Sequence, residues 1–315
     1  MIRLQAHFFA MPQPMLFDSH AHLISPDVQR YPREAMGGAK PQEAQPDVDT
    51  STEALIALMD AHEVGQVCAV QRAFIYGYDN SYILDAARAY PDRITPVLVV
   101  DATDASTPSL LRRLADGQRL GGIRLSAPRA DPFSLDWLES PAAMETWRAA
   151  EELELPVAVI FFRTHRGRAI PALARIARRF PGVPVVIDHV GVPHGTIYDG
   201  KYAGVPESDY PPGGAPGFDL DELVRGLAEL RNTFFKVTSI NFRRLIGAGI
   251  PTASFVRHLA DVFGADRLMW GSDVGQTRGL YGPKVDAARM AASELSPAER
   301  AAFLHDTGAR LYMNA

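Results

Sequence analysis

Two histidines separated by one residue, His20 and His22, are the side chains of this sequence whose spacing is best suited to chemistry. They follow an apolar run that begins at Met15, and such a run predicts a buried strand that ends at the pair. Side chains alternate between the two faces of a strand, so residues i and i+2 place both imidazoles on one face. Two neutral imidazoles side by side can bind a divalent cation or polarise a carbonyl group.

Two further polar residues follow predicted strands elsewhere in the chain. His189 ends one apolar run, and Asp273 directly follows another. Each has an ordinary explanation on its own, since a histidine after a strand can be structural and Asp273 could cap the helix that follows it. Four such residues at the ends of three strands are better explained by a common site.

The elements that would position these residues alternate along the chain. Eight short apolar runs predict strands near residues 15–20, 66–71, 94–100, 121–126, 156–162, 184–189, 234–239 and 267–272. Apolar residues three and four apart predict helices over 52–62, 80–90, 140–153, 170–180, 219–230 and 252–263. Nearly continuous apolar strands alternating with helices indicate a parallel sheet covered on its outer face. Eight such units predict an α/β fold, a single-domain (β/α)8 TIM barrel.

One segment precedes this alternation and two long segments interrupt it. Residues 1–14 are expected to be an N-terminal extension to a barrel domain of residues 15–315. Long loops rich in proline and glycine are expected at about 25–49, after the first strand, and at about 190–217, after the sixth. Loops that follow the strands of such a barrel lie on its catalytic face. We therefore expect both loops above the site, with a lid-like role for the second.

The composition narrows the class of partner. The net charge is −5 and no basic tract is present, which argues against nucleic acid or an anionic membrane as a partner. Cys68 is the only cysteine, so an intrachain disulfide is excluded and a reducing compartment is favoured. We expect a cytoplasmic protein with a small-molecule partner, and a homo-oligomer remains open.

In combination, the motifs resemble the amidohydrolase superfamily. They are His-x-His after the first strand, Val-Ile-Asp-His-Val-Gly at 186–191 and Trp-Gly-Ser-Asp at 270–273. Tyr-Pro at 31–32, Gly-Ile-Arg at 122–124, Phe-Lys-Val-Thr at 235–238 and Ala-Arg-Leu-Tyr at 309–312 resemble the branch that contains 2-pyrone-4,6-dicarboxylate lactonase and sugar-acid lactonases. The resemblance runs from about residue 18 to 312 and implies the same barrel.

The resemblance implies roles for individual residues. Asp273 matches the aspartate that acts as general base toward water, while His20, His22 and His189 match imidazoles that bind a metal or polarise the substrate carbonyl. One divalent cation, with Zn2+ as the first choice, would be held by these three histidines and Asp273, and metal-free catalysis is the alternative. Arginines at the ends of strands 4 and 7 would bind substrate carboxylates, because a guanidinium pairs with a carboxylate in a planar fork. The candidate substrate-binding residues are Arg124, Arg129, Arg243, Arg244, Phe161 and Tyr198.

The function predicted from these residues is a hydrolase that opens a lactone or similar cyclic ester of a small carboxylated compound. Such a reaction needs a base beside water and positive or donor groups where the oxyanion develops. The alternatives are a metal-dependent decarboxylase of a small aromatic or unsaturated acid, a lactone isomerase, and a barrel that only binds a ligand. Strand 5 has no histidine, since His165 follows it, and strand 4 carries Arg124. Both features disfavour a binuclear metal centre, and the missing histidine also disfavours the decarboxylases.

Overall fold

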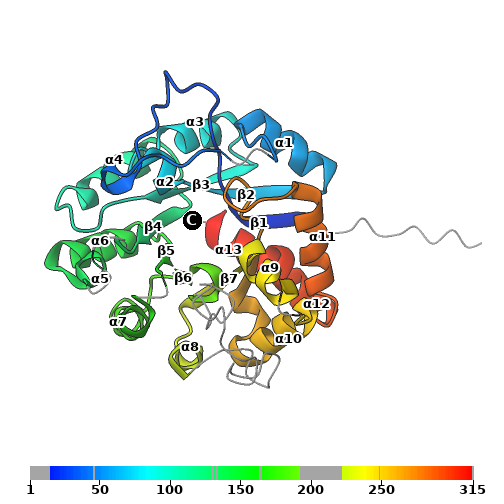
Figure 1. Ribbon diagram of the computed structural model, residues 1–315. Helices are drawn as coiled ribbons and strands as arrows, with labels where there is room; N and C mark the ends of the chain where they lie inside the picture. Colours follow the sequence, from blue (N-terminus) through cyan, green and yellow to red (C-terminus); the bar gives the residue numbers. More distant parts are fainter. Residues whose placement is uncertain are drawn as a thin grey trace, which may run out of the picture.

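The computed structural model describes residues 15–44, 47–128, 131, 134–162, 165–191, 222–247 and 249–313. Its strands form a ring, and most of its helices lie outside that ring (Figure 1). The strands are β1 (Leu16–Ala21), β2 (Val64–Val70), β3 (Ile94–Val99), β4 (Gly122–Ser126), β5 (Val157–Ile160), β6 (Val185–Ile187), β7 (Thr233–Thr238) and β8 (Leu268–Gly271).

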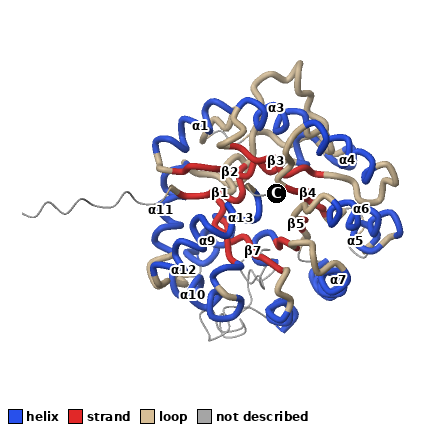
Figure 2. The backbone as a smooth tube through the Cα atoms, turned by 180° about the vertical axis from the view of Figure 1, so that it is seen from behind, coloured by secondary structure: helices blue, strands red, loops and turns tan. Residues whose placement is uncertain are grey.

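Helices connect these strands and cover the outer face of the ring, as the tube in Figure 2 also shows. The α-helices are α1 (Thr52–Ala61), α2 (Ala73–Tyr76), α3 (Ser81–Ala89), α4 (Thr107–Gly117), α5 (Asp136–Glu139), α6 (Pro141–Glu152), α7 (Arg166–Arg179), α8 (Glu222–Arg225), α9 (Ser239–Gly247), α10 (Thr252–Phe263), α11 (Tyr281–Ala291), α12 (Pro297–Ala301) and α13 (Thr307–Tyr312). Short 3-10 or π turns are η1 (Met36–Gly38), η3 (Asp188–Gly191), η5 (Gly226–Glu229), η6 (Ala265–Arg267) and η7 (Ala302–Asp306).

The sheet is parallel throughout, with the strands in the order β1 to β8. Its two edges meet at a seam where Ala21 bridges Val274. There the amide of His22 donates to the Val274 carbonyl (2.9 Å), and the amide of Asp273 donates to the His20 carbonyl (2.7 Å). The predicted (β/α)8 barrel is confirmed, and its closure brings the His-x-His pair beside Asp273.

The barrel has two hydrophobic layers. One lies between the strands and the helices, and the other fills the barrel interior near the amino ends of the strands. Tyr312 of α13 belongs to the inner layer and stacks on Phe17 with ring centroids 6.4 Å apart. Figure 1 places α13 and the C-terminus near the centre of the ring. Because α13 packs against the floor of the barrel, the polar centre lies at its other end.

The eight predicted strands coincide with the observed ones to within a few residues. Among the helices of nine or more residues, α4, α9 and α11 were not predicted. The helix α9 starts at Ser239, directly after β7, so no separate loop marks its beginning in the sequence. Residues 25–49, apart from 45 and 46, are described and contain only the short η1 turn. The predicted extension (1–14) and nearly all of the predicted loop at 190–217 lie outside the described residues.

Among the described helices, none combines the length and the apolar character that a bilayer crossing requires.

Candidate active site

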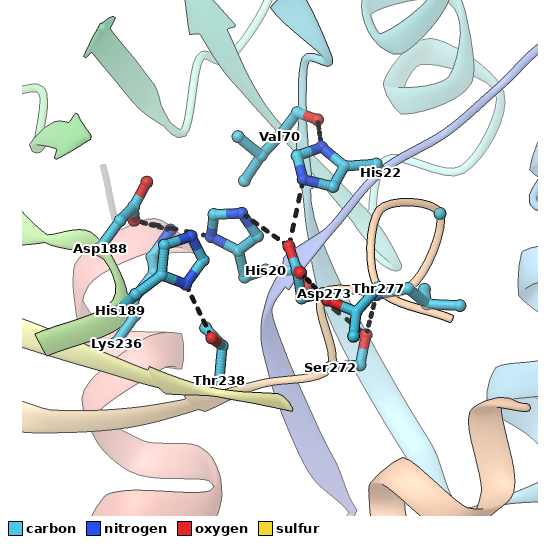
Figure 3. A network of polar contacts seen from close by, with 12 residues as sticks. His20, His22, Val70, Asp188, His189, Lys236, Thr238, Ser272, Asp273 and Thr277 are labelled. Atoms are coloured by element: carbon cyan, nitrogen blue, oxygen red, sulfur yellow. Dashed lines mark hydrogen bonds and ion pairs between the residues drawn. The ribbon is translucent and has the colours of Figure 1, made fainter. Parts of the chain in front are cut away.

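Three side chains from the seam of the barrel converge on one point. His20 Nε2 lies 3.6 Å from Asp273 Oδ1, and His22 Nε2 lies 3.4 Å from the same oxygen. Figure 3 shows both rings pointing toward this carboxylate. All three residues are buried, with exposed fractions of 2% or less. A base and two imidazoles therefore share a water-poor position at the end of the barrel.

The hydrogen bond on the far side of His22 fixes the tautomer of its neutral ring. Its Nδ1 lies 2.7 Å from the Val70 carbonyl, which can only accept, so Nδ1 carries the proton. Burial lowers the pKa of His22, so the ring is neutral and Nε2 carries a lone pair. Two electron-rich atoms, His22 Nε2 and Asp273 Oδ1, thus face each other, an arrangement that suits a cation or a bridging water.

A second buried carboxylate, Asp188, lies on the other side of His20. Its Oδ1 is 3.5 Å from His20 Nδ1 and 3.8 Å from Lys236 Nζ, and its Oδ2 accepts a hydrogen bond from Arg124 Nε at 2.8 Å. Burial opposes ionisation of Asp188, but Arg124, His20 and Lys236 hold its pKa well below the usual range. An ionised Asp188 favours a proton on His20 Nδ1 and leaves Nε2 to face Asp273.

His189 completes the cluster from the turn after β6. Its Nδ1 makes a 2.7 Å hydrogen bond with the Thr238 hydroxyl, and its ring centroid lies 5.3 Å from that of His20. Asn241 Nδ2 donates to the His189 carbonyl at 3.1 Å. Burial lowers the pKa of His189 to about 4, so the ring is neutral at physiological pH. It can polarise a carbonyl or bind a cation, depending on its tautomer.

The turn that carries Asp273 is tightly constrained. Asp273 has a left-handed φ of 52°, which is uncommon for a residue with a side chain. The Thr277 hydroxyl donates to Asp273 Oδ2, and the Thr277 amide donates to the Asp273 carbonyl at 2.9 Å. At Gly271 a Cβ would lie 2.6 Å from the Cβ of His20, so glycine is needed for the strands to approach this closely.

The charge of Asp273 follows from its neighbours. Burial alone would raise its pKa, yet His22, His189 and His20 around the carboxylate hold that pKa below its usual range. Burial also lowers the pKa of His20 well below the ordinary value for an imidazole. At neutral pH the site therefore holds a carboxylate able to accept a proton and three uncharged imidazoles.

The donor set fits a divalent cation. Two groups with ligand atoms within 4.8 Å of one another share His20: one adds His22 and Asp273, the other Asp188 and His189. In the described part of the chain, His20 Nδ1 and Nε2, Asp188 Oδ1 and Asp273 Oδ1 are buried without a hydrogen-bond partner. Imidazole and carboxylate are common ligands of Zn2+ and Mn2+. The four predicted ligands thus fall into two overlapping triads, and Asp188 joins them.

The predicted substrate-binding residues are distributed differently. Arg124 is buried at the centre and paired with Asp188. Arg243 and Arg244 lie on α9, the first exposed and the second half-buried, where burial lowers the pKa of Arg244 to about 9. Phe161 packs in the outer hydrophobic layer rather than in the polar centre. Arg129 and Tyr198 lie outside the described residues.

Sequence reasoning missed three charged members of this region, Asp188, Lys236 and Arg72, as functional residues. Asp188 could have been found, because it precedes His189 at a strand end. Arg72 lies two residues after the end of the apolar strand β2, which is a comparable signal. Lys236 sits within β7 and is fully buried in the barrel interior, which only the strand's orientation reveals.

A cavity of about 600 Å³ opens on the same end of the barrel. It lies between the loop after β1, the ends of β3 and β4, and the start of α5, and such a volume accommodates a small molecule. Its lining includes Gln42, Phe74, Asp101, Ser126 and Trp137. The three histidines and Asp273 do not line it, so the cavity is separate from the polar centre.

Similarity to known proteins covers nearly the whole chain. Residues 17–313 match the Amidohydro_2 (amidohydrolase) family model. An L-fucono-1,5-lactonase from Burkholderia ambifaria is 27% identical over 212 residues, which span 65% of this chain and 63% of that protein.

Solved structures share the fold. A probable 2-pyrone-4,6-dicarboxylic acid hydrolase from Acinetobacter baumannii, with citric acid bound, has a TM-score of 0.69 at 22% identity over 95% of this chain and 99% of that one. A 5-carboxyvanillate decarboxylase from Sphingomonas paucimobilis has a TM-score of 0.64 at 17% identity over 96% and 99% of the two chains. With the family model matched from the first strand to the last helix, the chain belongs to the amidohydrolase family.

Proposed function

We propose that this protein is a lactonase that opens a lactone or similar cyclic ester of a small carboxylated compound, with Asp273 as general base. The observation that carries the proposal is the convergence of His20 Nε2 and His22 Nε2 on Asp273 Oδ1, at 3.6 and 3.4 Å. The similarity to an L-fucono-1,5-lactonase supports the same reaction class.

In this reaction water adds to the ring carbonyl carbon while the Asp273 carboxylate accepts the proton that the water loses. The ring C–O bond then breaks, and the proton on Asp273 passes to the departing ring oxygen, which yields a hydroxy acid. His20, His22 and His189 surround the base and polarise the carbonyl or bind a cation. No redox change occurs, and one water is consumed for each ring opened.

A divalent cation would be held by His20, His22 and Asp273, with Asp188 and His189 as the second set of donors. When bound, it supplies a Lewis acid that lowers the pKa of water and polarises a carbonyl oxygen. Zn2+ is our proposal for its identity, because the two imidazoles and a carboxylate are typical zinc donors.

The remaining proposals concern substrate and setting. Arg124, Arg243 and Arg244 are the proposed carboxylate-binding groups among the described residues, and Arg129 and Tyr198 stay predictions. Arg124 contributes Nε to Asp188, so its other guanidinium nitrogens are the part offered to a substrate. A cytoplasmic location and a homo-oligomer also stay predictions.

The test combines elemental analysis of the purified protein with a hydrolysis panel, run with and without chelator. The panel contains D-gluconolactone, δ-valerolactone and 2-pyrone-4,6-dicarboxylate, the last taken from the name of the fold relative. We expect at least one lactone to be opened. A tightly bound metal with chelator-sensitive hydrolysis assigns a role to the cation, and hydrolysis that survives its removal assigns carbonyl polarisation to the imidazoles alone.

Failure to open any lactone, with release of carbon dioxide from an aromatic acid such as 5-carboxyvanillate instead, would replace the lactonase proposal with the decarboxylase alternative.

A further inference from the structure

Arg72 is a buried arginine that joins two loops at the catalytic end of the barrel. Its exposed fraction is 2%, and it lies between β2 and α2. Nη2 donates to Gln42 Oε1 at 3.0 Å, and Nη1 donates to the Gly275 carbonyl. Nε has no hydrogen-bond partner among the described residues. The guanidinium thus spans from the loop after β1 to the turn after β8.

Gly275 belongs to the turn that positions Asp273. It has a φ of 84°, and a Cβ at this position would collide with the His22 carbonyl. Asp273, two residues earlier, has the left-handed φ of 52°. A non-glycine residue remains in that conformation only when its surroundings hold it there. The bond from Arg72 to Gly275 is one of the contacts that does so.

Charge gives Arg72 a second link to Asp273. Both of its hydrogen-bond partners are neutral, and a buried cation without a counter-charge is costly. Burial lowers the pKa of Arg72 to about 10, and the negative charge of Asp273 acts against that shift. The carboxylate is therefore the nearby anion that stabilises the guanidinium.

Gln42, the second hydrogen-bond partner of Arg72, connects it to the cavity. Gln42 lines the cavity, and its backbone amide donates to the Phe74 carbonyl at 2.8 Å, which anchors the loop after β1. A substrate group that occupies the cavity would thus contact the residue that holds Arg72, and Arg72 holds the turn of the general base.

We propose that Arg72 is a positioning residue: it holds the Asp273 turn in its catalytic conformation and couples that turn to the cavity wall through Gln42. The inference rests on the proposed function in one respect, the role of Asp273 as base. Arg72 itself need not touch the substrate, so its loss should affect turnover more than substrate binding.

The experiment compares Arg72→Met, Arg72→Lys and Gln42→Met with the wild type on the best lactone of the panel. A displaced base lowers kcat by about 10- to 100-fold, with KM changed less than about twofold in Arg72→Met. Arg72→Lys keeps one donor, so its kcat should lie between those of the wild type and Arg72→Met. Gln42→Met should lower kcat less than Arg72→Met does. The double variant Gln42→Met/Arg72→Met should have the same kcat as Arg72→Met alone, because Gln42 acts through Arg72.

The control is Arg267→Met. Arg267 is also buried, with an exposed fraction of 3%, and it also donates to carbonyl groups, those of Phe263, Leu230 and Ala228. It precedes β8 and lies at the opposite end of the barrel. This variant should lower thermal stability and leave kcat of the folded enzyme unchanged. If Arg267→Met lowered kcat as much as Arg72→Met does, the loss of any buried arginine would lower kcat, and the proposal would be overturned.

Two other results would also overturn it. A large rise in KM with little change in kcat would make Arg72 a substrate-binding group. Crystal structures of the wild type and Arg72→Met with the 273–277 turn unmoved would remove its positioning role. This structural comparison does not depend on activity, so it decides the role of Arg72 even if no lactone is hydrolysed and the proposed function fails.

Discussion

At the scale of single residues, the site is defined by which lone pairs and protons face each other. His22 Nδ1 donates a hydrogen bond to the Val70 carbonyl, so the lone pair of its Nε2 faces Asp273. On the opposite side, the negative charge of Asp188, whose Oδ1 lies 3.5 Å from His20 Nδ1, favours a proton on that nitrogen. Backbone and carboxylate partners of this kind fix a ring's tautomer and orientation. The protonation of the two imidazoles beside Asp273 thus depends on partners on their far sides.

Replacing Asp273 with asparagine tests the base directly. Asparagine keeps the size and the hydrogen bond to Thr277 but cannot accept a proton from water. We expect kcat to fall by at least about 100-fold, the order of a general-base contribution, with an unchanged circular dichroism spectrum. Steady-state kinetics on the best lactone of the panel measure this. Turnover close to that of the wild type in the folded variant would remove Asp273 from the role of base.

At the scale of elements, the seam between β1 and β8 both closes the barrel and builds the site. Asp18 of β1 links the two strands, since its Oδ1 accepts from the amides of Ser272 (2.8 Å) and His20 (3.1 Å). Its Oδ2 accepts from the Tyr281 hydroxyl of α11 at 3.1 Å. Burial raises the pKa of Asp18 to about 6 in spite of these donors.

The raised pKa of Asp18 predicts a pH-dependent cost to stability. The folded chain keeps this proton up to about pH 6, whereas the unfolded chain loses it near pH 4, so the folded state loses stability as the pH rises through that window. Asp18→Asn can keep the three hydrogen bonds and does not titrate. When the pH is raised from about 5 to about 8, the free energy of unfolding of the variant should therefore increase by about 1 kcal/mol relative to that of the wild type.

Urea unfolding of both proteins at the two pH values measures this difference. His189 opposes the trend, because its lowered pKa costs stability as the pH falls, but it does so equally in both proteins. A stability difference between variant and wild type that is the same at both pH values would contradict the assignment to Asp18.

At the scale of the whole molecule, the loops on one end of the barrel decide what reaches the site. The polar centre is deeply buried, while the cavity of about 600 Å³ beside it is open to larger groups. The loop after β1 forms one wall of this cavity, and the ends of β3 and β4 form another. We therefore expect the cavity to limit the size of the substrate, while the bond that reacts lies at the polar centre.

Filling the cavity should affect substrates according to their size. Thr103 is exposed on the cavity rim, so Thr103→Trp narrows the cavity without disturbing the core. We expect KM for D-gluconolactone to rise by about 10-fold, equivalent to about 1.4 kcal/mol, and KM for the smaller δ-valerolactone to stay the same. The matched control is Ala105→Trp, an exposed position in the same loop outside the lining. An unchanged KM for D-gluconolactone in Thr103→Trp would exclude the cavity from substrate binding.

The sequence alone determined the fold and identified the principal groups of the candidate site. Eight apolar runs alternating with amphipathic segments leave few alternatives to a barrel, because a parallel strand must be covered on both faces. His20, His22, His189 and Asp273 were identifiable since each stands where a predicted strand ends, and such ends meet on one face of a barrel. Local patterns and chain order were sufficient for these inferences.

Only the tertiary structure decided how those groups are held. Arg124 was predicted to bind a substrate carboxylate, and the structure adds a partner that the sequence did not indicate, Asp188, which is 64 residues away in the chain. Arg72 meets Gly275 across 203 residues, and Lys236 occupies the interior near Asp188. The positions of buried charges depend on long-range packing and on where counter-charges end up. No periodicity or spacing records these relations, so they follow from the closed barrel and not from the sequence pattern.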